Sequence, residues 1–400
     1  MKDLRSVGLF SGIGGIEIGF RSAGIGTEFL CEIDDAANRV IRQAFPDVPL
    51  QTDIQKLKSL PDVEVIAAGF PCQNLSLVGN NEGIHGKKSG IVNEVFRLLA
   101  KPLPSLKWVV LENVPFMLWH KSGHAIRYVT SKLERLGFRW AYRVVDTRSF
   151  GLPQRRRRIL IVASRTEDPR SVLFADHMEP PRIEDDGQVP CGFSWTEGRA
   201  GLGWAINAVP TLKAGSGVGI PSPPAIWMRS EDSIVTPNIC DAERLQGFPA
   251  GWTDIQINNR PIRLGFRWRM VGNAVTVPLS RWLGNRLYNP LPFDESCKLP
   301  KWQGGTWPNA AYGNSNSVFP VETSEYPLRK KMQGLDIFLR YPTHMLSARA
   351  AFGFLSRARS SSLKFAPGFL DAVERHVHRM RKDEAFSAVP AYLSNSSATT

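Results

Sequence analysis

Short apolar runs alternate with amphipathic segments from residue 4 to about residue 164. Two amphipathic segments, residues 35–45 and 125–136, have helical periodicity, and Gly137 favours the end of the second helix. Six apolar runs predict β-strands: LRSVGLF, EFLCEID, VEVIAAGF, KWVVLENV, RWAYRVVD and RRILIVAS. This alternation predicts an α/β domain with a mostly parallel sheet over residues 1–164.

The pattern changes after residue 164. Residues 165–235 are rich in Pro and Gly and lack sustained periodicity, which predicts an inserted, smaller, loop-rich domain. Residues 236–288 contain DAERLQGF and VPLSRWLGNRLY, where regular structure is expected to return to the first domain. Residues 289–400 form a C-terminal extension, in which PGFLDAVERHVHRMRK has helical periodicity. The pattern assigns no role to this extension.

Composition limits the class of protein. Of the 400 residues, 42% are hydrophobic, which is enough for a sizeable core. No apolar run approaches the roughly 20 residues of a membrane span, so we expect no membrane contact and a cytoplasmic protein. The five cysteines are odd in number and scattered without a CxxC spacing. This arrangement argues against a disulfide framework or a zinc site, and we expect no bound metal.

Charge points to a partner without identifying it. Lys and Arg number 50 against 37 Asp and Glu, a formal net charge of +13. Such an excess favours a polyanion through phosphate contacts and counterion release. Charge alone leaves nucleic-acid binding and simple solubility about equally open.

A glycine-rich turn follows the first predicted strand. The sequence FSGIGG, from Phe10 to Gly15, precedes a predicted helix, and its glycines let a ligand approach the backbone closely. The turn lacks the GK[ST] ending of a phosphate-binding loop, so a nucleotide without a bound phosphate fits better. Glu32 follows the second strand, where a carboxylate can accept hydrogen bonds from ribose hydroxyls, and Asp53 is placed to meet an adenine amino group. A tight turn without a ligand is the alternative.

Two further strand ends carry reactive groups. GFPCQ at residues 69–73 places the thiol of Cys72 at the carboxyl edge of the sheet, before a polar loop in which a thiol can ionise. Most lone cysteines are inert and buried. Glu112, in KWVVLENV, follows four apolar residues, so we expect a raised pKa that lets it share a proton with a substrate. A strand-end acid that caps a helix is the alternative.

An arginine run precedes the last of these strands. In QRRRR, strand alternation places Arg156 and Arg158 on one face and Arg155 and Arg157 on the other. One pair is expected to face the site and the other to face solvent or phosphate. A charge run alone more often forms a solvated surface or a nonspecific phosphate patch.

These four signals, in this order, resemble motifs I, IV, VI and VIII of the DNA (cytosine-5)-methyltransferase family, in its bacterial and phage modification form. RLQGFP at residues 244–249 and VGNAV at residues 271–275 resemble motifs IX and X. The resemblance spans residues 4 to about 288, and six motifs in order argue strongly against chance. It implies a Rossmann-like S-adenosylmethionine-dependent methyltransferase fold in which residues 165–235 form the target-recognition domain.

The resemblance also implies a reaction. A methyl group passes from S-adenosylmethionine, leaving S-adenosylhomocysteine, to C5 of a cytosine flipped out of double-stranded DNA. Cys72 is implied to attack C6 and Glu112 to protonate or hydrogen-bond N3. Arg156 is implied to hold the O2 of the base, and Arg158 to support Cys72 or Glu112.

Binding residues follow from the same resemblance. Phe10 is implied to stack near the adenine and Glu32 to bind the ribose. The other implied cofactor residues are Gly12, Gly14, Gly15, Ile33, Asp53, Ile54, Pro71, Asn273 and Val275. DNA contacts are implied for Gln73, Ser76, Thr211 and Leu212. For Thr211 and Leu212, a buried hydrophobic turn is the alternative.

Two rival functions are open at this point. The first is an RNA methyltransferase of the same fold, which would use the same cysteine and glutamate; the long insertion and the spacing of motifs IX and X favour DNA. The second is a DNA-binding protein on an inactive scaffold, against which the intact Cys72, Glu112 and Arg156 argue. We expect a monomeric modification enzyme, nucleoid-associated when bound to DNA, with a cognate restriction endonuclease for the same site. The recognition sequence does not follow from the chain.

Overall fold

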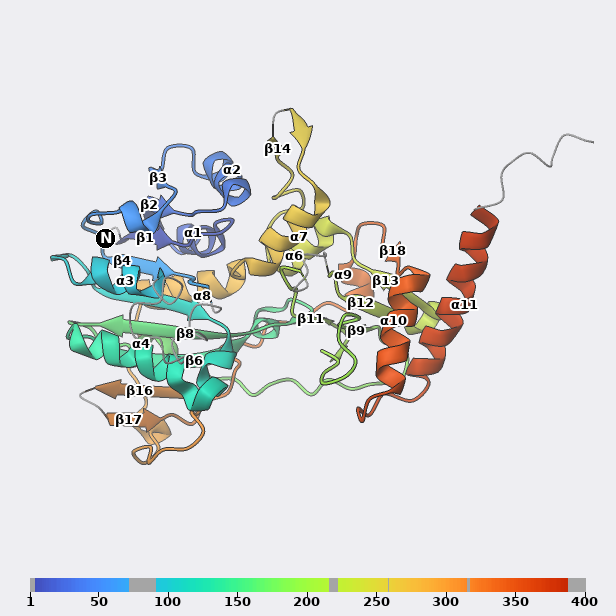
Figure 1. Ribbon diagram of the computed structural model, residues 1–400. Coiled ribbons are helices and arrows are strands. Elements are labelled where there is room, and N and C mark those ends of the chain that lie inside the picture. The colour runs from blue at the N-terminus through green and yellow to red at the C-terminus, as the bar shows by residue number, and fades with distance from the viewer. Residues whose placement is uncertain (1–3, 72–90, 216–221, 258, 315–316, 388–400) are drawn as a thin grey trace, which may run out of the picture.

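The computed structural model of this chain describes residues 4–71, 91–215, 222–257, 259–314 and 317–387. Figure 1 shows a large sheet flanked by helices at one end of the molecule and a small sheet covered by two C-terminal helices at the other. Within the described residues, no helix has both the length and the apolar character needed to cross a bilayer.

The large sheet has nine strands, and the six predicted strands all belong to it. Its order is β17 (Ser317–Pro320), β16 (Ala310–Asn314), β6 (Arg139–Asp146), β8 (Arg157–Ser164), β5 (Trp108–Asn113), β4 (Val65–Ala68), β1 (Leu4–Leu9), β2 (Ile25–Cys31) and β3 (Leu50–Gln51). Strands β3, β2, β1, β4 and β5 are parallel, whereas β8 and β16 run antiparallel to both their neighbours. The α/β class with a mostly parallel sheet is thereby confirmed.

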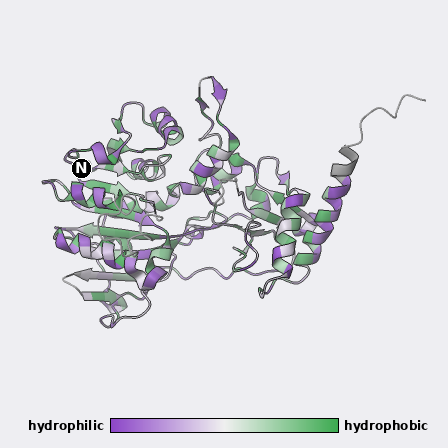
Figure 2. Cartoon of the chain, viewed as in Figure 1, coloured by the Kyte–Doolittle hydropathy of each residue, from purple (hydrophilic) through white to green (hydrophobic). Residues whose placement is uncertain are grey.

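Helices cover both faces of this sheet. Strand β5 is buried at all six positions, as expected for a strand with helices on both sides. One face packs against α3 (Ile91–Leu99) and α4 (His124–Arg135), and the other against α1 (Gly15–Arg21), α5 (Arg170–Leu173) and α8 (Val277–Tyr288). Helix α2 (Asp35–Ala44), whose periodicity was also predicted, lies at the β2 end of the sheet. In Figure 2 the central strands are mostly green and the outer faces of the helices mostly purple, in agreement with this core.

The small sheet has five antiparallel strands, so the region expected to be loop-rich contains regular structure. Its order is β10 (Ala205–Ile206), β9 (Cys191–Phe193), β12 (Ala225–Met228), β13 (Ser233–Thr236) and β18 (His344–Met345). Helices α10 (Ala348–Arg359) and α11 (Phe369–Ser387) pack on it. The ring of Phe193 lies 5.0 Å from that of Phe354 and 4.9 Å from that of Phe369, measured between centroids.

The C-terminal extension therefore contributes to both sheets. Strands β16 and β17 lengthen the large sheet, and β18, α10 and α11 complete the small one. Between these parts, the buried carboxylate of Asp241 accepts hydrogen bonds from the backbone N–H groups of Arg340 and Tyr341. These two bonds fix residues 340–341, which lie between β17 and β18 in the chain, to α6 (Ile239–Leu245).

Short elements connect the two sheets. They are the parallel pair β7 (Gln154–Arg155) and β11 (Val209–Pro210), the helices α6 (Ile239–Leu245), α7 (Leu264–Asn273) and α9 (Leu335–Phe338), the hairpin β14 (Gln256–Ile257) and β15 (Arg260–Pro261), and the 3₁₀ turns η1 (Ile54–Lys56), η4 (Pro115–Leu118), η5 (His120–Gly123), η6 (Thr147–Phe150), η7 (Arg229–Glu231) and η8 (Glu295–Cys297). The side chain of Gln154 donates a 2.8 Å hydrogen bond to the carbonyl of Leu245, and that of Gln246 donates one of 2.8 Å to the carbonyl of Val271. Buried amides thus join the arginine run to α6 and α7.

Candidate active site

Strand register aligns the predicted motifs at one edge of the large sheet. Cys31, Leu9, Ala68 and Leu111 are successive partners across β2, β1, β4 and β5. The residues that follow them form the next row, which is Glu32, Phe10, Gly69 and Glu112. Because these strands are parallel, the row lies at their carboxyl ends, where open α/β sheets bind ligands.

Gly69 lies at the point where the motifs meet. An atom at the position of a Cβ on Gly69 would lie 3.6 Å from Oε2 of Glu112, 3.7 Å from a methyl of Val275 and 3.8 Å from the carbonyl oxygen of Phe10. Motifs I, IV, VI and X thus converge within a few ångströms. Residues Cys72, Gln73 and Ser76, which were predicted to act here, lie outside the described residues.

The glycine-rich turn has a backbone suited to a ligand. Phe10 has φ +57°, a left-handed value that is costly for a residue with a side chain and is often found at functional sites. A Cβ on Gly12 would meet no atom within 4 Å, so the turn is open on that side. A Cβ on Gly15 would instead lie 2.1 Å from the carbonyl oxygen of Val275, which makes a side chain at Gly15 incompatible with this packing.

Glu32 closes the other side of this turn. Its Oε2 accepts a 2.8 Å hydrogen bond from the N–H of Gly12, and its Oε1 accepts one of the same length from Asp34. The side chain is only 9% exposed, and burial raises its pKa, against the effect of these hydrogen bonds. Each carboxylate oxygen can still accept a second donor, such as a ribose hydroxyl.

The other predicted cofactor residues differ in exposure. Ile33 is 71% exposed, which is unusual for a large apolar side chain and leaves it available to a ligand. Pro71 and Asn273 are exposed and Val275 is half-buried. Asp53 caps η1 by accepting a hydrogen bond from the N–H of Gln55. The side chain of Ile54 lies in the core, which leaves it only the backbone for a cofactor contact.

Glu112 forms a buried ion pair. Its Oε1 lies 2.9 Å from Nε of Arg158, and both side chains are 10% exposed. Burial raises the pKa of the Glu112 carboxyl, although Arg158 and Arg156 oppose this shift. The neighbouring Asn113 donates a 3.0 Å hydrogen bond from Nδ2 to the carbonyl of Phe70. This bond fixes the segment before Cys72 beside the acid.

Arg156 and Arg158 have different hydrogen-bond partners. Its side chain is buried, and it donates hydrogen bonds to the carbonyls of Leu212 at 3.1 Å, Gly272 at 3.1 Å and Ala274 at 2.6 Å. Burial lowers the pKa of its guanidinium. These carbonyls bind both terminal nitrogens of Arg156, whereas Arg158 is the arginine that pairs with Glu112, and the expectation that Arg156 holds the base stays a prediction.

Comparisons with known proteins agree with this site. The family model of C-5 cytosine-specific DNA methylases matches residues 4–189. Type II methyltransferase M2.BsuMI of Bacillus subtilis (strain 168) is 45% identical over 386 residues, which cover 93% of this chain and 98% of that protein. This chain belongs to the C-5 cytosine-specific DNA methylase family. It is a DNA (cytosine-5)-methyltransferase.

More distant proteins agree with this assignment. Type II methyltransferase M.HaeII of Haemophilus aegyptius is 28% identical over 318 residues, which cover 73% of this chain and 95% of M.HaeII. The crystal structure of S. pombe Dnmt2 methyltransferase has a TM-score of 0.53 at 17% identity and covers 71% of this chain and 98% of its own. The latter comparison shows a shared fold.

In this methylase, Thr211 and Leu212, the two implied DNA contacts after residue 200, differ in burial. The half-buried Thr211 donates a 2.9 Å hydrogen bond from Oγ1 to the carbonyl of Arg155, and it lines the cleft described below. The side chain of Leu212 is buried in the core, and its N–H donates to Oε1 of Gln154. The burial of Leu212 agrees with the alternative of a buried turn, and the DNA contact of both residues stays a prediction.

A cleft of about 400 Å³ separates the catalytic edge from the small sheet. Arg155, Arg157 and Arg158 line it, so both faces of the arginine run contribute to it. Arg155 is exposed, and Arg157 is half-buried and pairs with Glu325. Phe116 and Trp119 also line the cleft, and no motif in the sequence marks them.

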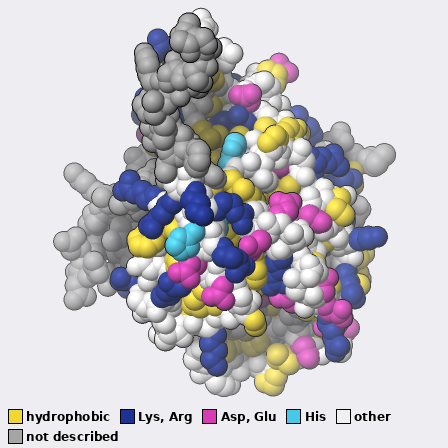
Figure 3. Space-filling view, turned by 90° about the vertical axis from the view of Figure 1, so that its right-hand side faces the viewer, with side chains coloured by type: hydrophobic (Ala, Val, Ile, Leu, Met, Phe, Trp, Pro, Cys, Tyr) yellow, Lys and Arg dark blue, Asp and Glu magenta, His cyan; other side chains and the backbone are white. Residues whose placement is uncertain are grey.

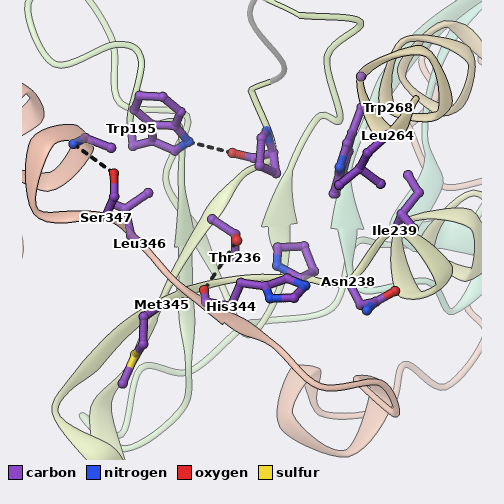
Figure 4. Close-up of a pocket in the computed structure, with 14 residues that line it drawn as sticks. Trp195, Thr236, Asn238, Ile239, Leu264, Trp268, His344, Met345, Leu346 and Ser347 are labelled. Carbon is purple, nitrogen blue, oxygen red and sulfur yellow. Dashed lines mark hydrogen bonds between the residues drawn. The ribbon is translucent and has the colours of Figure 1, made fainter. Parts of the chain in front are cut away.

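A second cavity, of about 470 Å³, lies between β13, β18, α7 and α10 (Figure 4). Of the described residues that line it, none is Asp, Glu, Lys or Arg. The indole of Trp195 donates to the carbonyl of Pro223, and Thr236 donates to the carbonyl of His344. The cavity is mainly apolar, and His344 is the one titratable side chain among the described residues that line it.

The basic C-terminal helices form a mixed surface. Figure 3 shows Lys and Arg side chains interspersed with Asp and Glu side chains on the face that carries α10 and α11. Arg359 pairs with Glu374 at 2.7 Å, and Arg375 pairs with Asp232 at 2.7 Å. This favours a solvated surface with ion pairs over a continuous phosphate-binding patch.

Proposed function

We propose that this methyltransferase transfers a methyl group from S-adenosylmethionine to C5 of a cytosine flipped out of a specific double-stranded DNA sequence, through a covalent adduct with Cys72. One observation carries the proposal. The buried pair of Glu112 and Arg158 lies beside Gly69, three residues before Cys72, in a row with the turn at Phe10 and with Glu32. An acid, a thiol and a nucleoside site would then share one edge of the sheet.

The turn and the residues around it fit the cofactor. The open side of Gly12 leaves room for the methionine part, Glu32 has acceptor capacity for ribose hydroxyls, and the exposed Ile33 offers an apolar surface to the adenine. When bound, the cofactor supplies an electrophilic methyl group on a sulfonium. Its positive charge also suits an edge that carries two buried carboxyls.

The proposed chemistry uses a nucleophile and an acid. The thiolate of Cys72 forms a bond to C6, and the electrons of the C5–C6 double bond become available at C5. Glu112 donates a proton or a hydrogen bond to N3, for which its raised pKa is suited. C5 then takes the methyl group with loss of S-adenosylhomocysteine, and any proton taken up by N3 returns to Glu112. A base removes the C5 proton, the double bond forms again, and the bond from C6 to sulfur breaks to release Cys72.

Arg158 takes the role first expected of Arg156. Because Nε of Arg158 holds Oε1 of Glu112, this arginine fixes the direction of the acid and brings a positive charge to the base. We assign the contact to O2 of the cytosine to Arg158. Arg156 instead joins the target-recognition segment at Leu212 to Ala274, which lies between the proposed cofactor residues Asn273 and Val275.

Base flipping is part of the proposal because C5 and C6 cannot be reached within a stacked duplex. Extrusion costs a few kcal/mol, which contacts in the cleft would offset. Since the relatives named above are type II methyltransferases, we further propose that the protein is the modification half of a restriction-modification system. Protection of host DNA from a cognate endonuclease would support this role, and failure to protect against any such enzyme would oppose it.

The decisive experiment uses a host that lacks DNA methylation. Nucleosides from its DNA and RNA are analysed by mass spectrometry after expression of the wild type or Cys72→Ala, and the DNA is sequenced after bisulfite treatment. We expect 5-methyldeoxycytidine with the wild type alone, at one sequence. Methylcytidine confined to RNA would favour an RNA methyltransferase, and an absence of both products would favour an inactive scaffold.

A further inference from the structure

Two exposed aromatic side chains line the cleft beside Arg158. Phe116 is 44% exposed and Trp119 is 46% exposed, and both follow Glu112 closely in the chain. Neighbouring exposed aromatic groups on a protein surface commonly mark a binding site. Their role is not part of the methyl-transfer chemistry proposed above.

The local sequence fixes both rings outward. Met117 and Leu118, which lie between them, are buried in the core of the large sheet, and Pro115 occupies the start of η4. The ring of Phe116 stacks on that of His120 at 4.5 Å and meets the ring of Trp119 edge-on at 6.4 Å. The turn therefore presents a preformed aromatic surface, which would lose little conformational entropy on binding.

Basic side chains line the same cleft, and one of them, Arg157, pairs with Glu325. Arg155 and Arg157 line it from the arginine run, and Lys213 lines it from the target-recognition segment. Glu197 is the one acidic side chain among the described residues that line this cleft, and it pairs with Lys213. Aromatic surfaces beside Lys and Arg side chains are the combination that binds unpaired nucleotides, through base stacking and phosphate contacts.

We propose that Phe116 and Trp119 pack against the nucleotide next to the flipped cytosine in the target strand. This inference rests on the proposed function. Flipping removes a base from the stack and uncovers the face of its neighbour, whose lost stacking an aromatic side chain can replace. The two rings follow the Glu112 strand in the chain, and the basic side chains that line the same cleft can contact the phosphates.

The test compares Phe116→Ala, Trp119→Ala and Trp119→Phe with the wild type. The control is Phe352→Ala, which removes a 50% exposed ring from α10, on the small-sheet side of the molecule. Methyl transfer from radiolabelled S-adenosylmethionine to a long unmethylated duplex DNA gives KM for DNA and kcat, and thermal unfolding checks the fold.

We expect each alanine variant to raise KM for DNA about tenfold, the loss typical of one stacked base. Trp119→Phe should keep most of the affinity, and Phe352→Ala should match the wild type. The salt dependence of DNA affinity should be unchanged in Trp119→Ala, because no phosphate contact is lost, whereas Arg155→Ala should reduce the slope by about one.

Alanine variants with the same KM as Phe352→Ala would overturn the inference, and so would a loss in Trp119→Phe as large as in Trp119→Ala. Neither result would contradict the proposed function as long as the wild type methylates the DNA. A wild type that methylates no DNA would instead remove the proposed function, and the inference with it.

Discussion

The carboxyl edge of the large sheet and the interior of the small sheet both bury ionisable side chains, with different results. At the edge, burial raises the pKa values of Glu32 and Glu112, and it raises that of Glu17, beneath the glycine-rich turn, to about 7. In the small sheet, both ring nitrogens of His376 are bonded, to the N–H of Ile234 at 3.3 Å and to the carbonyl of Leu346 at 2.7 Å. The carboxylates at the edge can still accept hydrogen bonds from a ligand. In the small sheet, both nitrogens of His376 are used to join the C-terminal segment to β13.

Two arginines of the run QRRRR also differ in the kind of partner that they bind. Arg158 pairs with an acid at the catalytic edge, and Arg156 donates to three backbone carbonyls. An ionic partner that can exchange bonds with a substrate suits catalysis. Fixed carbonyl partners suit the junction between domains, because a buried carbonyl that loses its donor is costly.

The largest effect should come from Glu112, the proposed general acid. Glu112→Gln keeps the shape of the side chain and removes its proton, so kcat should fall by about 10²–10⁴-fold, the usual contribution of a general acid. The measurement is single-turnover methylation with cofactor and enzyme in excess, together with binding of both ligands.

The matched control for Glu112→Gln is Glu64→Gln, which changes an acid paired with Arg5 before the start of β4. It should leave kcat unchanged. A Glu112→Gln enzyme with wild-type kcat would show that the catalytic edge does not use this acid.

Arg156→Met should mainly destabilise the fold. Three buried carbonyls lose their donor, and we expect a loss of about 3 kcal/mol in the free energy of unfolding, measured with urea. Arg155→Met, one residue earlier and exposed, is the control and should change the unfolding free energy little. Equal stabilities would contradict the junction role of Arg156.

Glu32→Ala should weaken cofactor binding. The variant loses a carboxylate that orients the Gly12 turn and that is proposed to bind ribose, so the Kd for S-adenosylmethionine should rise about 10- to 100-fold. Calorimetry measures this Kd, and DNA affinity should be unchanged. Glu28→Ala, an exposed acid on the same strand, serves as control; an equal rise there would argue against a specific ribose contact.

The smallest effect concerns pH and the small sheet. Burial lowers the pKa of His376, so the unfolded chain binds a proton that the folded chain resists. This contribution to stability is present above the unfolded pKa of about 6.5 and is lost as the pH falls further, by at most about 1.4 kcal/mol per pH unit.

Unfolding free energies between pH 7 and pH 5 test this expectation. The slope should be shallower in His376→Gln than in the wild type, while His378→Gln, exposed on the same helix, should keep the wild-type slope. Identical slopes for all three proteins would mean that His376 does not contribute to the pH dependence.

Local patterns predicted the parts of the site that depend on neighbouring residues. Strand periodicity located the six strands, although β2 ends at Cys31, three residues before the predicted run ends. The same periodicity assigned Arg156 and Arg158 to one face, and both side chains are buried. It could not say which arginine meets Glu112. That depends on carbonyls that lie 56, 116 and 118 residues from Arg156 in the chain, and a carbonyl has no sequence signature.

By itself, the sequence determined the α/β class, the order of the motifs and the residues at the strand ends, because side-chain periodicity and turn residues act within a few positions. Only the tertiary structure decided how the C-terminal extension divides between two sheets, since β16 pairs with β6 and β18 with β13 across more than 100 residues. It also decided that Phe116 and Trp119 stay exposed, while Met117 and Leu118 between them are buried. Both results have the same cause, because the packing of distant segments decides which surfaces meet. The residue type of an apolar side chain does not show whether the protein core or a ligand covers it.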